Sequence, residues 1–329
     1  RVGGRPDLTS VDTTDLNFGI PRLGEACFDS PVSLRFVEDD ERVLYDSDLK
    51  TVQAALAAGK QPACFELAGA RRKIFFDPAK LSCGIVTCGG LCPGLNDVIR
   101  SIVFGLSYHY GVQTVWGFRF GYEGLVARCG HEPLPLTPDV VDAIHEDGGT
   151  ILGSSRGPQD VGEMVDTLQR MGIGILFALG GDGTQRGALA IAEETRRRNL
   201  PISVIGIPKT VDNDVSFVQQ SFGFHTAVSQ TRTPIIGAHW ESKGVRNGVG
   251  LVKLMGRYSG FLAAYATLAN SDVNFCLVPE VPFTLPGFLD ALRQRLERRG
   301  HAVVVVADSL RVLLLGLTLG YRRAAAMLG

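Results

Sequence analysis

An almost uninterrupted apolar run, IGILFALGG at residues 173–181, constrains the fold more than any other stretch of this 329-residue chain. Strands that are buried on both faces have this composition, and they occur almost only in parallel sheets covered by helices. An amphipathic stretch follows at 182–198, and helical patterns also separate the apolar runs at 81–88, 112–118 and 202–207. This alternation predicts parallel strand–helix–strand units, and therefore an α/β fold with a doubly wound, Rossmann-like parallel sheet.

The same pattern divides the chain into three parts. Residues 1–80 lack sustained periodicity and are predicted to form an N-terminal arm. Residues 81–215 carry the alternation and are predicted to form a first α/β domain. Residues 216–329 are predicted to form a second, smaller α/β domain. Its candidate strands and helices lie at 248–256, 259–269, 273–280, 284–300 and 301–307.

The composition excludes several classes of protein. The chain has 33 basic and 34 acidic side chains, so it lacks the positive field that attracts nucleic acids and anionic membranes. The apolar run at 312–320 is far shorter than the roughly 20 residues of a membrane-spanning helix. No targeting segment is visible, so we expect a cytoplasmic protein. An organelle is the alternative, because the chain starts at Arg1 rather than at a methionine.

Seven cysteines, an odd number in a long chain, do not indicate a disulfide framework. Three of them, Cys83, Cys88 and Cys92, cluster across a predicted buried strand and the turn after it, without a paired CxxC motif elsewhere. Buried free thiols are therefore the expected state of these side chains, rather than zinc ligands.

Four turns that follow predicted strands carry unusual residues, and ligands of parallel α/β sheets bind beyond the carboxyl ends of the strands. The turns are CGGLCPGLN (88–96), GSSRGPQD (153–160), GGDGT (180–184) and IPKTVDND (207–214). The first leads into a helix N-terminus and can bind an anion, although a purely structural turn explains its glycines about as well. The second places Arg156 at a strand end, either in a surface ion pair or as a phosphate clamp.

The other two turns bring carboxylates to the same region. Asp182 in GGDGT could hold Mg²⁺, with Gly183 leaving room beside the backbone; a helix cap by Asp182 or Thr184 is the alternative. If the strands at 173–180 and 202–207 are neighbours, Asp212 shares an edge of the sheet with Asp182. A metal carboxylate beside a carboxylate that accepts a hydroxyl proton is what phosphoryl transfer needs, whereas solvated turn formers are the alternative.

In this order the four motifs resemble those of the phosphofructokinase family, and the resemblance runs from about residue 81 to about residue 307. It includes GFHTAV (223–228), VKLMGRYSGF (253–262) and LVPEVPF (277–283). GGDGT alone is shared with NAD kinases and lipid kinases of the diacylglycerol type, whereas PKTVDND and MGR together are typical of 6-phosphofructokinases. The detailed pattern is similar to the ATP-dependent enzymes of trypanosomatids and plants, which are relatives of the pyrophosphate-dependent group.

The resemblance implies phosphoryl transfer from ATP to the 1-hydroxyl of fructose 6-phosphate, with Mg²⁺, in a homo-oligomer that is a tetramer in the family. Residues 81–215 would bind the nucleotide and residues 216–329 the sugar phosphate. Asp212 is implied as the general base, Thr210 and Asp214 as its supports, and Asp182 as the Mg²⁺ ligand.

Further roles are implied by the same motifs. Amides of Gly89 and Gly90 would meet the transferred phosphoryl group, and Arg156 and Arg257 would neutralise its charge in the transition state. The resemblance implies that the remaining nucleotide contacts are Gly181, Gly183 and Thr184, and that the sugar phosphate contacts Met255, Gly256, Arg257 and Glu280 as well as Thr210, Asp212 and Asp214.

Two residues bear on the phosphoryl donor. Pyrophosphate-using relatives tend to carry aspartate at the position of Gly183, where its bulk and charge oppose the α-phosphate of ATP, so glycine favours ATP. Lys209, in contrast, is typical of pyrophosphate users. The ATP-dependent enzymes of trypanosomatids and plants combine both features, as this chain does.

Two segments depart from the family pattern. After residue 307 the family continues with Glu-Gly and a long segment rich in basic residues, and Arg311, Arg322 and Arg323 give no convincing match to it. In SQTRTPIIGAHWESKG (229–244), where relatives have a long helix, Pro234 and Gly237 are predicted to break it. We therefore expect an incomplete second domain.

The alternatives to an ATP-dependent enzyme are a non-catalytic paralogue or fragment that acts by subunit association, a pyrophosphate-dependent enzyme, or another GGDGT kinase.

Overall fold

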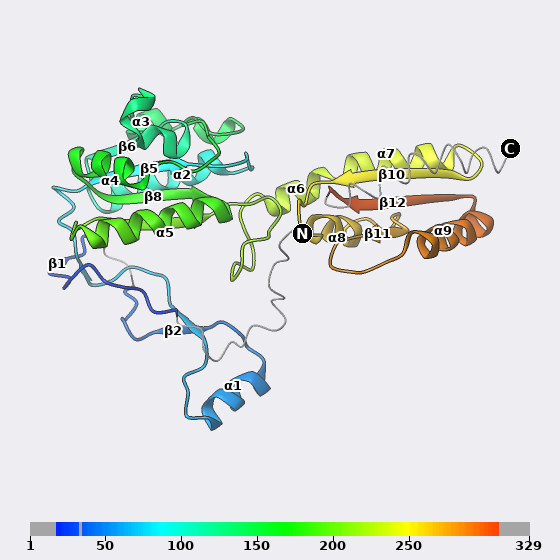
Figure 1. Ribbon diagram of the computed structural model, residues 1–329, viewed down its shortest axis with the longest axis horizontal. Coiled ribbons are helices and arrows are strands. Elements are labelled where there is room, and N and C mark those ends of the chain that lie inside the picture. The colour runs from blue at the N-terminus through cyan, green and yellow to red at the C-terminus, as the bar shows by residue number, and fades with distance from the viewer. Residues whose placement is uncertain (1–17, 33–34, 309–329) are drawn as a thin grey trace.

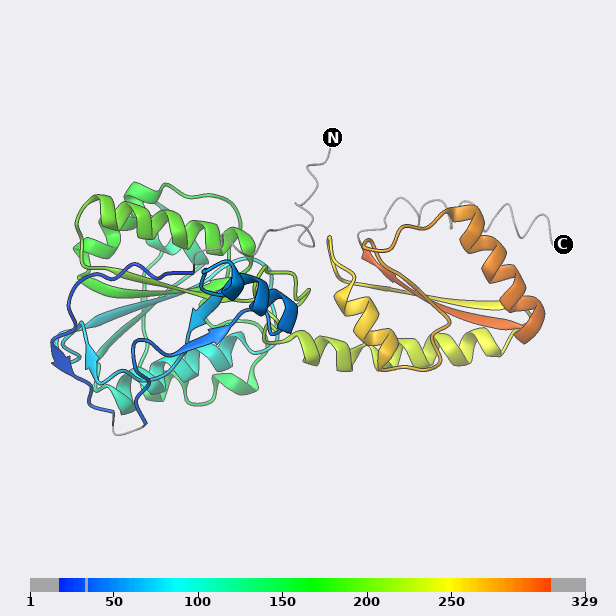
Figure 2. The same ribbon diagram turned by 90° about the horizontal axis from the view of Figure 1, so that it is seen from below.

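The computed structural model describes residues 18–32 and 35–308, which form an arm and two lobes (Figure 1). Each lobe is built on its own parallel sheet, and the loop between β9 (Ser203–Pro208) and α6 (Phe224–Gln230) joins them. Figure 2 shows the two sheets one after the other along the long axis, with helices on both faces of each. The expected α/β class with parallel strand–helix–strand units is confirmed.

The sheet of the first lobe has the strand order β7-β6-β5-β8-β9 and is parallel except for its antiparallel edge strand β7. Its other strands are β5 (Ser82–Thr87), β6 (Thr114–Phe118) and β8 (Ile173–Gly180), and β7 covers Leu134–Pro135. The helical segments around it are α2 (Leu95–Phe104), its π-helical continuation η3 (Gly105–His109), η4 (Gly121–Leu125), η5 (Ala127–Cys129), α3 (Pro138–Val141), η6 (Ile144–Glu146), α4 (Val161–Arg170) and α5 (Asp182–Arg197).

Side chains near the helix starts account for where these helices begin. Thr137 accepts a hydrogen bond from the amide of Val140, and Pro138 takes the first position of α3, where its missing N–H costs nothing. Asp160 accepts from the amide of Glu163 at 2.9 Å and begins α4.

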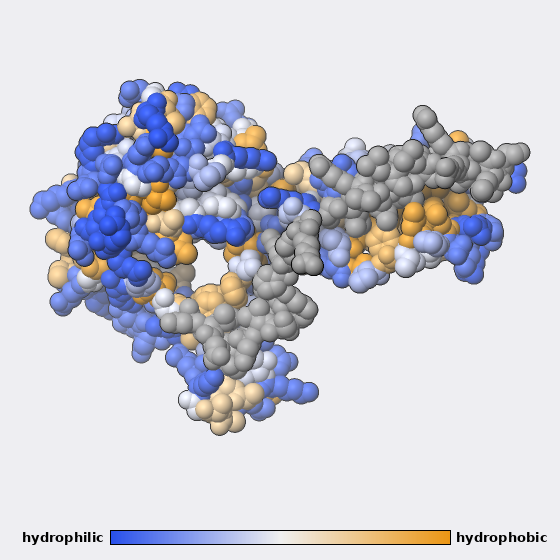
Figure 3. Space-filling model, viewed as in Figure 1, coloured by the Kyte–Doolittle hydropathy of each residue, from blue (hydrophilic) through white to orange (hydrophobic). Residues whose placement is uncertain are grey.

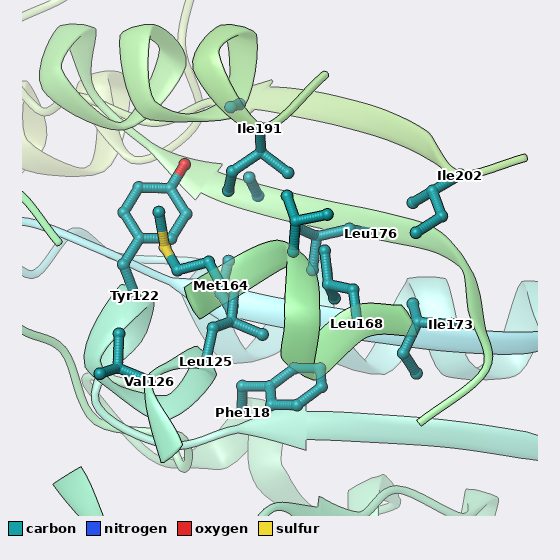
Figure 4. Packing of buried hydrophobic residues seen from close by; sticks show 14 of the residues in the cluster. Phe118, Tyr122, Leu125, Val126, Met164, Leu168, Ile173, Leu176, Ile191 and Ile202 are labelled. Carbon is teal, nitrogen blue, oxygen red and sulfur yellow. The ribbon is translucent and has the colours of Figure 1, made fainter. Parts of the chain in front are cut away.

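Alternate residues of the first sheet face two separate cores. On one face Leu176 and Ala178 pack with side chains from α4, α5 and the 3₁₀-helical segments, which is the cluster drawn in Figure 4. On the other face Cys83 and Ile85 pack with side chains from α2 and α3. A strand buried on both faces needs an apolar residue at nearly every position, which is why 173–181 reads as one apolar run.

The strand β9 differs from its prediction. The apolar run at 202–207 predicts another buried strand, but β9 lies at the edge of the sheet and Ile205 is 42% exposed. An edge strand has a hydrogen-bonded neighbour on one side only, so its apolar composition here reflects partial cover by α5 rather than full burial.

The second lobe contains a three-stranded parallel sheet with the order β10-β12-β11. Its elements are α6, α7 (Arg232–Lys243), β10 (Gly248–Leu254), α8 (Phe261–Leu268), β11 (Phe275–Leu277), α9 (Leu285–Arg299) and β12 (His301–Ala307). Val303 and Val305 of the central strand pack against α6, α7 and α8, whereas Val304 and Val306 pack against α9. Both faces of this sheet are therefore covered as well.

The segment at 229–244 corrects the sequence prediction, because Pro234 and Gly237 do not prevent a helix there. The segment forms the end of α6 and the whole of α7, with a single break at Thr231. Pro234 falls in the first turn of α7, where the helix has no internal acceptor for an N–H group. Gly237 only lowers helix propensity, and burial of Ile235 against the sheet outweighs that cost.

A second correction concerns TILG at 150–153: its apolar residues predict a short strand, but the segment forms a turn. Side chains rather than a neighbouring strand satisfy its backbone: Asn96 accepts from the amide of Ile151 at 2.9 Å, and Thr87 donates to the carbonyl of Gly153 at 2.7 Å. Leu152 still points into the core of the first lobe. Just before it, Thr137-Pro138-Asp139 and the glycines at 148–149 predict one short helix between them, but α3 ends at Val141 and a separate 3₁₀ turn, η6, follows.

The arm consists of short elements with few buried side chains. β1 (Phe28–Asp29) pairs with β4 (Lys73–Ile74), and β2 (Arg42–Leu44) pairs with β3 (Cys64–Glu66), both antiparallel. The helix α1 (Leu49–Ala57) follows β2 and begins at the cap residue Asp48. Among the described residues, no helix is long and apolar enough to cross a membrane. Arg311, Arg322 and Arg323 lie outside the described residues.

Candidate active site

The strand order of the first sheet creates a place where a ligand can enter between loops. The chain runs from β5 outward to β6 and later places β8 on the opposite side of β5. The loops that leave β5 and β8 therefore diverge from each other. Open α/β sheets bind ligands in the crevice at the point where the strand order reverses in this way. The loop after β9 lies at the same edge, because Pro208 is paired with Gly180 of β8. The expected proximity of the GGDGT and PKTVDND turns is confirmed.

Lys209 joins the glycine turn after β5 to the end of β9. Its side chain is only 4% exposed, and its ammonium group donates a hydrogen bond to the carbonyl of Gly90. A Cβ atom at Gly89 would lie 3.7 Å from the ammonium nitrogen, and the φ of +83° at this position favours glycine. Burial lowers the pKa of Lys209, Arg156 lowers it further, and Asp212 raises it. Lys209 thus holds two loops of the site together by its hydrogen bond to the backbone of Gly90.

The turn that carries Arg156 is attached to the same glycine turn. The amide of Gly89 donates to the carbonyl of Ser155 at 3.0 Å, and the hydroxyl of Ser154 donates to the carbonyl of Gly89. A Cβ atom at Gly90 would lie 3.3 Å from a terminal nitrogen of the exposed Arg156. A guanidinium group that reaches over a glycine turn is suited to bind a phosphate group.

The N-terminus of α5 presents the GGDGT turn to solvent. Gly181 is the N-cap residue and Asp182 the first helical residue, so the alternative of a cap by Asp182 or Thr184 is wrong. The carboxylate of Asp182 is 57% exposed and forms an ion pair with Arg186 one turn later. A Cβ atom at Gly183 would meet no atom within 4 Å. Backbone amides, a helix N-terminus and one carboxylate therefore lie together beside open space.

The loop after β9 holds Asp212 half-buried. Its Oδ1 atom is buried and has no hydrogen-bond partner among the described residues. The hydroxyl of Thr210 accepts from the amide of Asp212 at 3.1 Å and donates to Asp214 at 2.9 Å. Burial raises the pKa of Asp212, Asp214 raises it further, and Arg257 lowers it. A carboxylate oxygen without a partner and with a raised pKa is equipped to accept a proton.

A loop of the second lobe, residues 255–260, reaches the same carboxylate. The φ of +158° at Gly256 and the 2.3 Å that would separate its Cβ from the carbonyl oxygen of Ser259 admit only glycine there. Ser259 in turn is 3% exposed, and its hydroxyl donates to the carbonyl of Asp212 at 3.1 Å. This hydrogen bond connects the two lobes at the candidate base.

Other predicted residues of the second lobe are more exposed. Met255 is 60% exposed, and Arg257 is exposed with its guanidinium over the ring of Tyr258. Glu280, also exposed, accepts a hydrogen bond from the amide of Gly260 at 2.7 Å. Charge interaction with Asp212 places Arg257 near the candidate base.

Sequence reasoning missed residues that position the site. Ser259 was not singled out, although it lies inside the MGRYSG motif. Tyr122 of η4 donates its hydroxyl to the carbonyl of Thr184 at 2.7 Å and so fixes the first turn of α5. Gly187 leaves room for that ring, because a Cβ atom there would lie 2.6 Å from it. A glycine in the middle of a helical pattern was the available signal of this close approach.

The cysteines follow the prediction. All seven are free thiols, and Cys83, Cys88 and Cys92 are buried. Burial raises their pKa values to about 12, 12 and 11, respectively. Thiols with such pKa values are protonated at neutral pH and do not act as nucleophiles.

A divalent cation fits this arrangement when a phosphate-bearing substrate shares its coordination. No group of three or more His, Cys, Asp or Glu side chains within 18–32 and 35–308 is arranged to hold a metal ion. Mg²⁺ is usually bound by one or two carboxylates together with phosphate oxygens and water. Asp182 supplies one exposed carboxylate of the right kind, provided that Arg186 releases it.

Comparisons with known proteins show which family the chain resembles. The sequence model of the family described as Phosphofructokinase matches residues 82–318. The chain is 47% identical over 318 residues to the ATP-dependent 6-phosphofructokinase of Borreliella burgdorferi, an alignment that covers 91% of this chain and 70% of that protein. It is 48% identical over 274 residues to the ATP-dependent 6-phosphofructokinase of Trypanosoma cruzi, covering 83% and 56%.

The fold also matches solved structures. The crystal structure of the pyrophosphate-dependent phosphofructokinase from Marinobacter aquaeolei superposes with a TM-score of 0.63 at 25% sequence identity, covering 70% of this chain and 60% of that one. Against three of the curated relatives, the chain spans 70%, 65% and 56% of their length. The matched range passes residue 307, where the resemblance of motifs ended, and its last residues lie outside the described part of the chain.

Proposed function

The chain belongs to the phosphofructokinase family, and from this premise we propose that it transfers a phosphoryl group from ATP to the 1-hydroxyl of fructose 6-phosphate. The observation that carries the proposal is Asp212, whose buried oxygen has no partner among the described residues and whose pKa burial raises. It lies at the sheet edge that also carries the GGDGT turn. The names of the curated relatives supply the donor and the acceptor.

In this proposal Asp212 is the general base. Its unpartnered oxygen accepts the proton of the 1-hydroxyl while the hydroxyl oxygen attacks the γ-phosphorus of ATP. A P–O bond forms to the sugar, the P–O bond to ADP breaks, and ADP takes the electron pair. Thr210 and Asp214 hold the loop so that this oxygen faces the acceptor.

Negative charge that develops on the transferred group meets donors from both lobes. The amide of Gly90 and the guanidinium of Arg156 approach it from the first lobe, and Arg257 approaches it from the second. The amide of Gly89, expected to join them, instead donates to the carbonyl of Ser155 and holds the turn in place. Lys209 keeps the glycine turn in place by its hydrogen bond to Gly90. Donors fixed before the reaction stabilise a transition state without reorganisation during it.

The carboxylate of Asp182 is proposed to hold Mg²⁺ together with the phosphates of ATP. When bound, the ion neutralises charge on the phosphate oxygens. Before that, the carboxylate must exchange its ion pair with Arg186, an exposed pair of the kind that is worth at most about 1 kcal/mol. The chain can therefore give up the pair at little cost.

ATP is favoured over pyrophosphate because of the space at Gly183. No atom lies within 4 Å of the position of a Cβ there, so an α-phosphate can approach the helix N-terminus. Gly181 and Thr184 form the rest of the turn that faces the nucleotide. Met255, Gly256, Arg257 and Glu280 are proposed to contact the sugar phosphate.

We also propose a separate role for each of the three parts of the chain. Residues 81–215 bind the nucleotide, residues 216–329 bind the sugar phosphate, and residues 1–80 form the arm. A tetrameric assembly and a cytoplasmic location stay predictions.

A coupled assay tests the function directly. Fructose 6-phosphate and Mg²⁺ are supplied with ATP in one arm of the experiment and with pyrophosphate in the other. Turnover with ATP is the expected result. Turnover with pyrophosphate alone would overturn the argument from Gly183, and binding of ATP without any turnover would favour a non-catalytic member that acts through association with other subunits. Phosphorylation of NAD or a lipid instead would indicate another GGDGT kinase.

A further inference from the structure

Four aromatic rings connect the arm to the loop that carries Asp212. Phe18, Tyr45 and Phe65 belong to the arm, and Phe217 belongs to the loop between β9 and α6. The ring centroid of Phe217 lies 5.4 Å from that of Phe18 and 5.4 Å from that of Tyr45. Phe18 also packs against Phe65 at 4.4 Å. We call these four residues the aromatic clamp.

The arm side of the clamp is mounted on paired backbone. Phe65 lies in β3 opposite Val43 of β2, and the amide of Tyr45 donates to the carbonyl of Ala63 at 2.9 Å. Tyr45 and Phe65 meet edge to face with their centroids 5.9 Å apart. These two rings are therefore held by a two-stranded antiparallel sheet that is separate from both large sheets.

The loop side is closed by hydrogen bonds that lead back to the base. Asn213, next to Asp212, donates from its amide group to the carbonyl of Gln219 at 2.9 Å and accepts from the amide of Ser221 at 2.7 Å. The hydroxyl of Ser221 donates to the carbonyl of Thr210. A displacement of this closed loop therefore carries Asp212 with it.

Phe217 itself adopts an unusual backbone conformation. Its φ is +65°, a value that bulky side chains rarely take, and its side chain is 42% exposed. Such a conformation persists only where surrounding contacts impose it. The contacts observed for its ring are those with Phe18 and Tyr45 of the arm.

Figure 1 shows the loop between β9 and α6 extending toward the arm, and Figure 3 shows an opening between the arm and the first lobe. Contact at the clamp is thus local, and it falls on the loop that holds the candidate base.

We propose that the aromatic clamp is a positioning device by which the N-terminal arm holds the Asp212 loop in its catalytic conformation. This inference rests on the proposed function only for its kinetic consequence, because the effect on the loop itself is independent of turnover. Phe217 and Tyr45 are positioning residues: they act through the loop and touch no reacting atom.

The clamp also has a consequence for the acid–base behaviour of the site. The pKa of Asp212 is raised by burial and by Asp214 and Asp308, and lowered by Arg257 and Lys209. A loop that opens would expose Asp212 to water and remove the largest of these effects. Its pKa would then fall toward the ordinary range, and the acid limb of the kcat/KM profile would move to lower pH.

The test compares Phe217→Asn, Tyr45→Ala, the double variant and the ring-retaining Tyr45→Phe. Asparagine tolerates a positive φ, so Phe217→Asn removes the ring without adding backbone strain. Each single change is expected to raise amide hydrogen exchange in 212–221 and to lower kcat about ten-fold, with KM for ATP nearly unchanged. The double variant should be no worse than Phe217→Asn alone, because Tyr45 contacts the loop through the Phe217 ring, which that change has already removed. Tyr45→Phe should restore native exchange and kcat.

A matched control is Phe36→Ala, because Phe36 is an aromatic residue of the arm whose ring faces Arg72 and not the clamp. It should leave exchange in 212–221 and kcat as in the native chain. Unchanged exchange in that segment for folded Phe217→Asn and Tyr45→Ala would overturn the proposal, as would additive losses in the double variant. Changed exchange in a chain that shows no turnover at all would keep the clamp and reject the proposed function instead.

Discussion

The two lobes are built on the same principle but contribute to the site in different ways. In the first lobe three adjacent strands, β5, β8 and β9, end at one edge, and their loops are tied together by hydrogen bonds such as that from Lys209 to Gly90. In the second lobe the loop 255–260 reaches the site, and Met255 in this loop is 60% exposed, against 4% for Lys209. The first lobe is thus preorganised by its own contacts, whereas we expect side chains of the second lobe to be ordered by what they bind.

The largest effect should come from the base in the first lobe. Asp212→Asn keeps the shape of the side chain but cannot accept the proton, so turnover should fall about 1,000-fold while ATP affinity stays nearly native. Calorimetry of ATP binding and the coupled assay measure the two quantities. A large loss of ATP affinity with little loss of turnover would contradict the assignment.

The same variant should be more stable than the native chain at neutral pH. Burial raises the folded-state pKa of Asp212, so its ionised form opposes folding at every pH above its unfolded-state pKa, and the neutral amide removes this cost. The difference in melting temperature should shrink as the pH falls and Asp212 becomes protonated. A melting temperature below that of the native chain at neutral pH would show that the carboxylate is needed structurally.

The next largest effect concerns the donor site. Gly183→Asp places a carboxylate where the α-phosphate is expected, and repulsion between like charges should weaken ATP binding about 100-fold. Gly237→Asp is a matched control, because Gly237 is also an exposed helical glycine with no atom near its Cβ position but lies in α7 of the second lobe. Equal effects of the two substitutions on ATP binding would reject the nucleotide site at α5.

A fourth prediction concerns whether the two lobes unfold independently of each other. Val305→Ala in the core of the second lobe and Val86→Ala in the core of the first should each cost about 2 kcal/mol of unfolding free energy. Each change should speed amide hydrogen exchange mainly in its own lobe. Equal changes in both lobes for either variant would mean that the two unfold as one unit.

The smallest expected effect lies at the bond between the lobes. Ser259→Ala removes the hydrogen bond to the carbonyl of Asp212 and should lower kcat about five-fold, the equivalent of about 1 kcal/mol. Ser242 is a matched control: it is also 3% exposed, but its hydroxyl bonds to the carbonyl of His239 in its own helix. A comparable loss of kcat in Ser242→Ala would show a general packing effect rather than positioning of the base.

Much of the fold could be predicted from the sequence because the signals are local. Apolar runs and amphipathic stretches indicated the strands and helices. Thr137 before a proline and Asp160 three residues before Glu163 are local signals of helix starts, and α3 and α4 begin there. The failures have physical causes. At α7 a proline in the first helical turn does no harm, and at 150–153 side chains of distant residues satisfy a backbone that forms no strand.

The candidate site was predictable only in part. Short motifs at predicted strand ends indicated five residues of the site: Gly90, Arg156, Asp182, Lys209 and Asp212. Ser259, Tyr122 and Phe217 were missed, because nothing in their neighbourhood along the chain reveals that they contact Asp212, Thr184 and the arm.

The sequence by itself therefore determined the class of the fold, the segments that form the parallel strands, and the chemical groups of the site. All of these depend on residues close together in the chain. Only the tertiary structure decided that β9 is an edge strand, that Lys209 is buried against Gly90, and that the arm reaches the loop of Asp212. Burial, pKa shifts and contacts between distant segments depend on which surfaces meet in the folded chain, and that information is not contained in any local pattern.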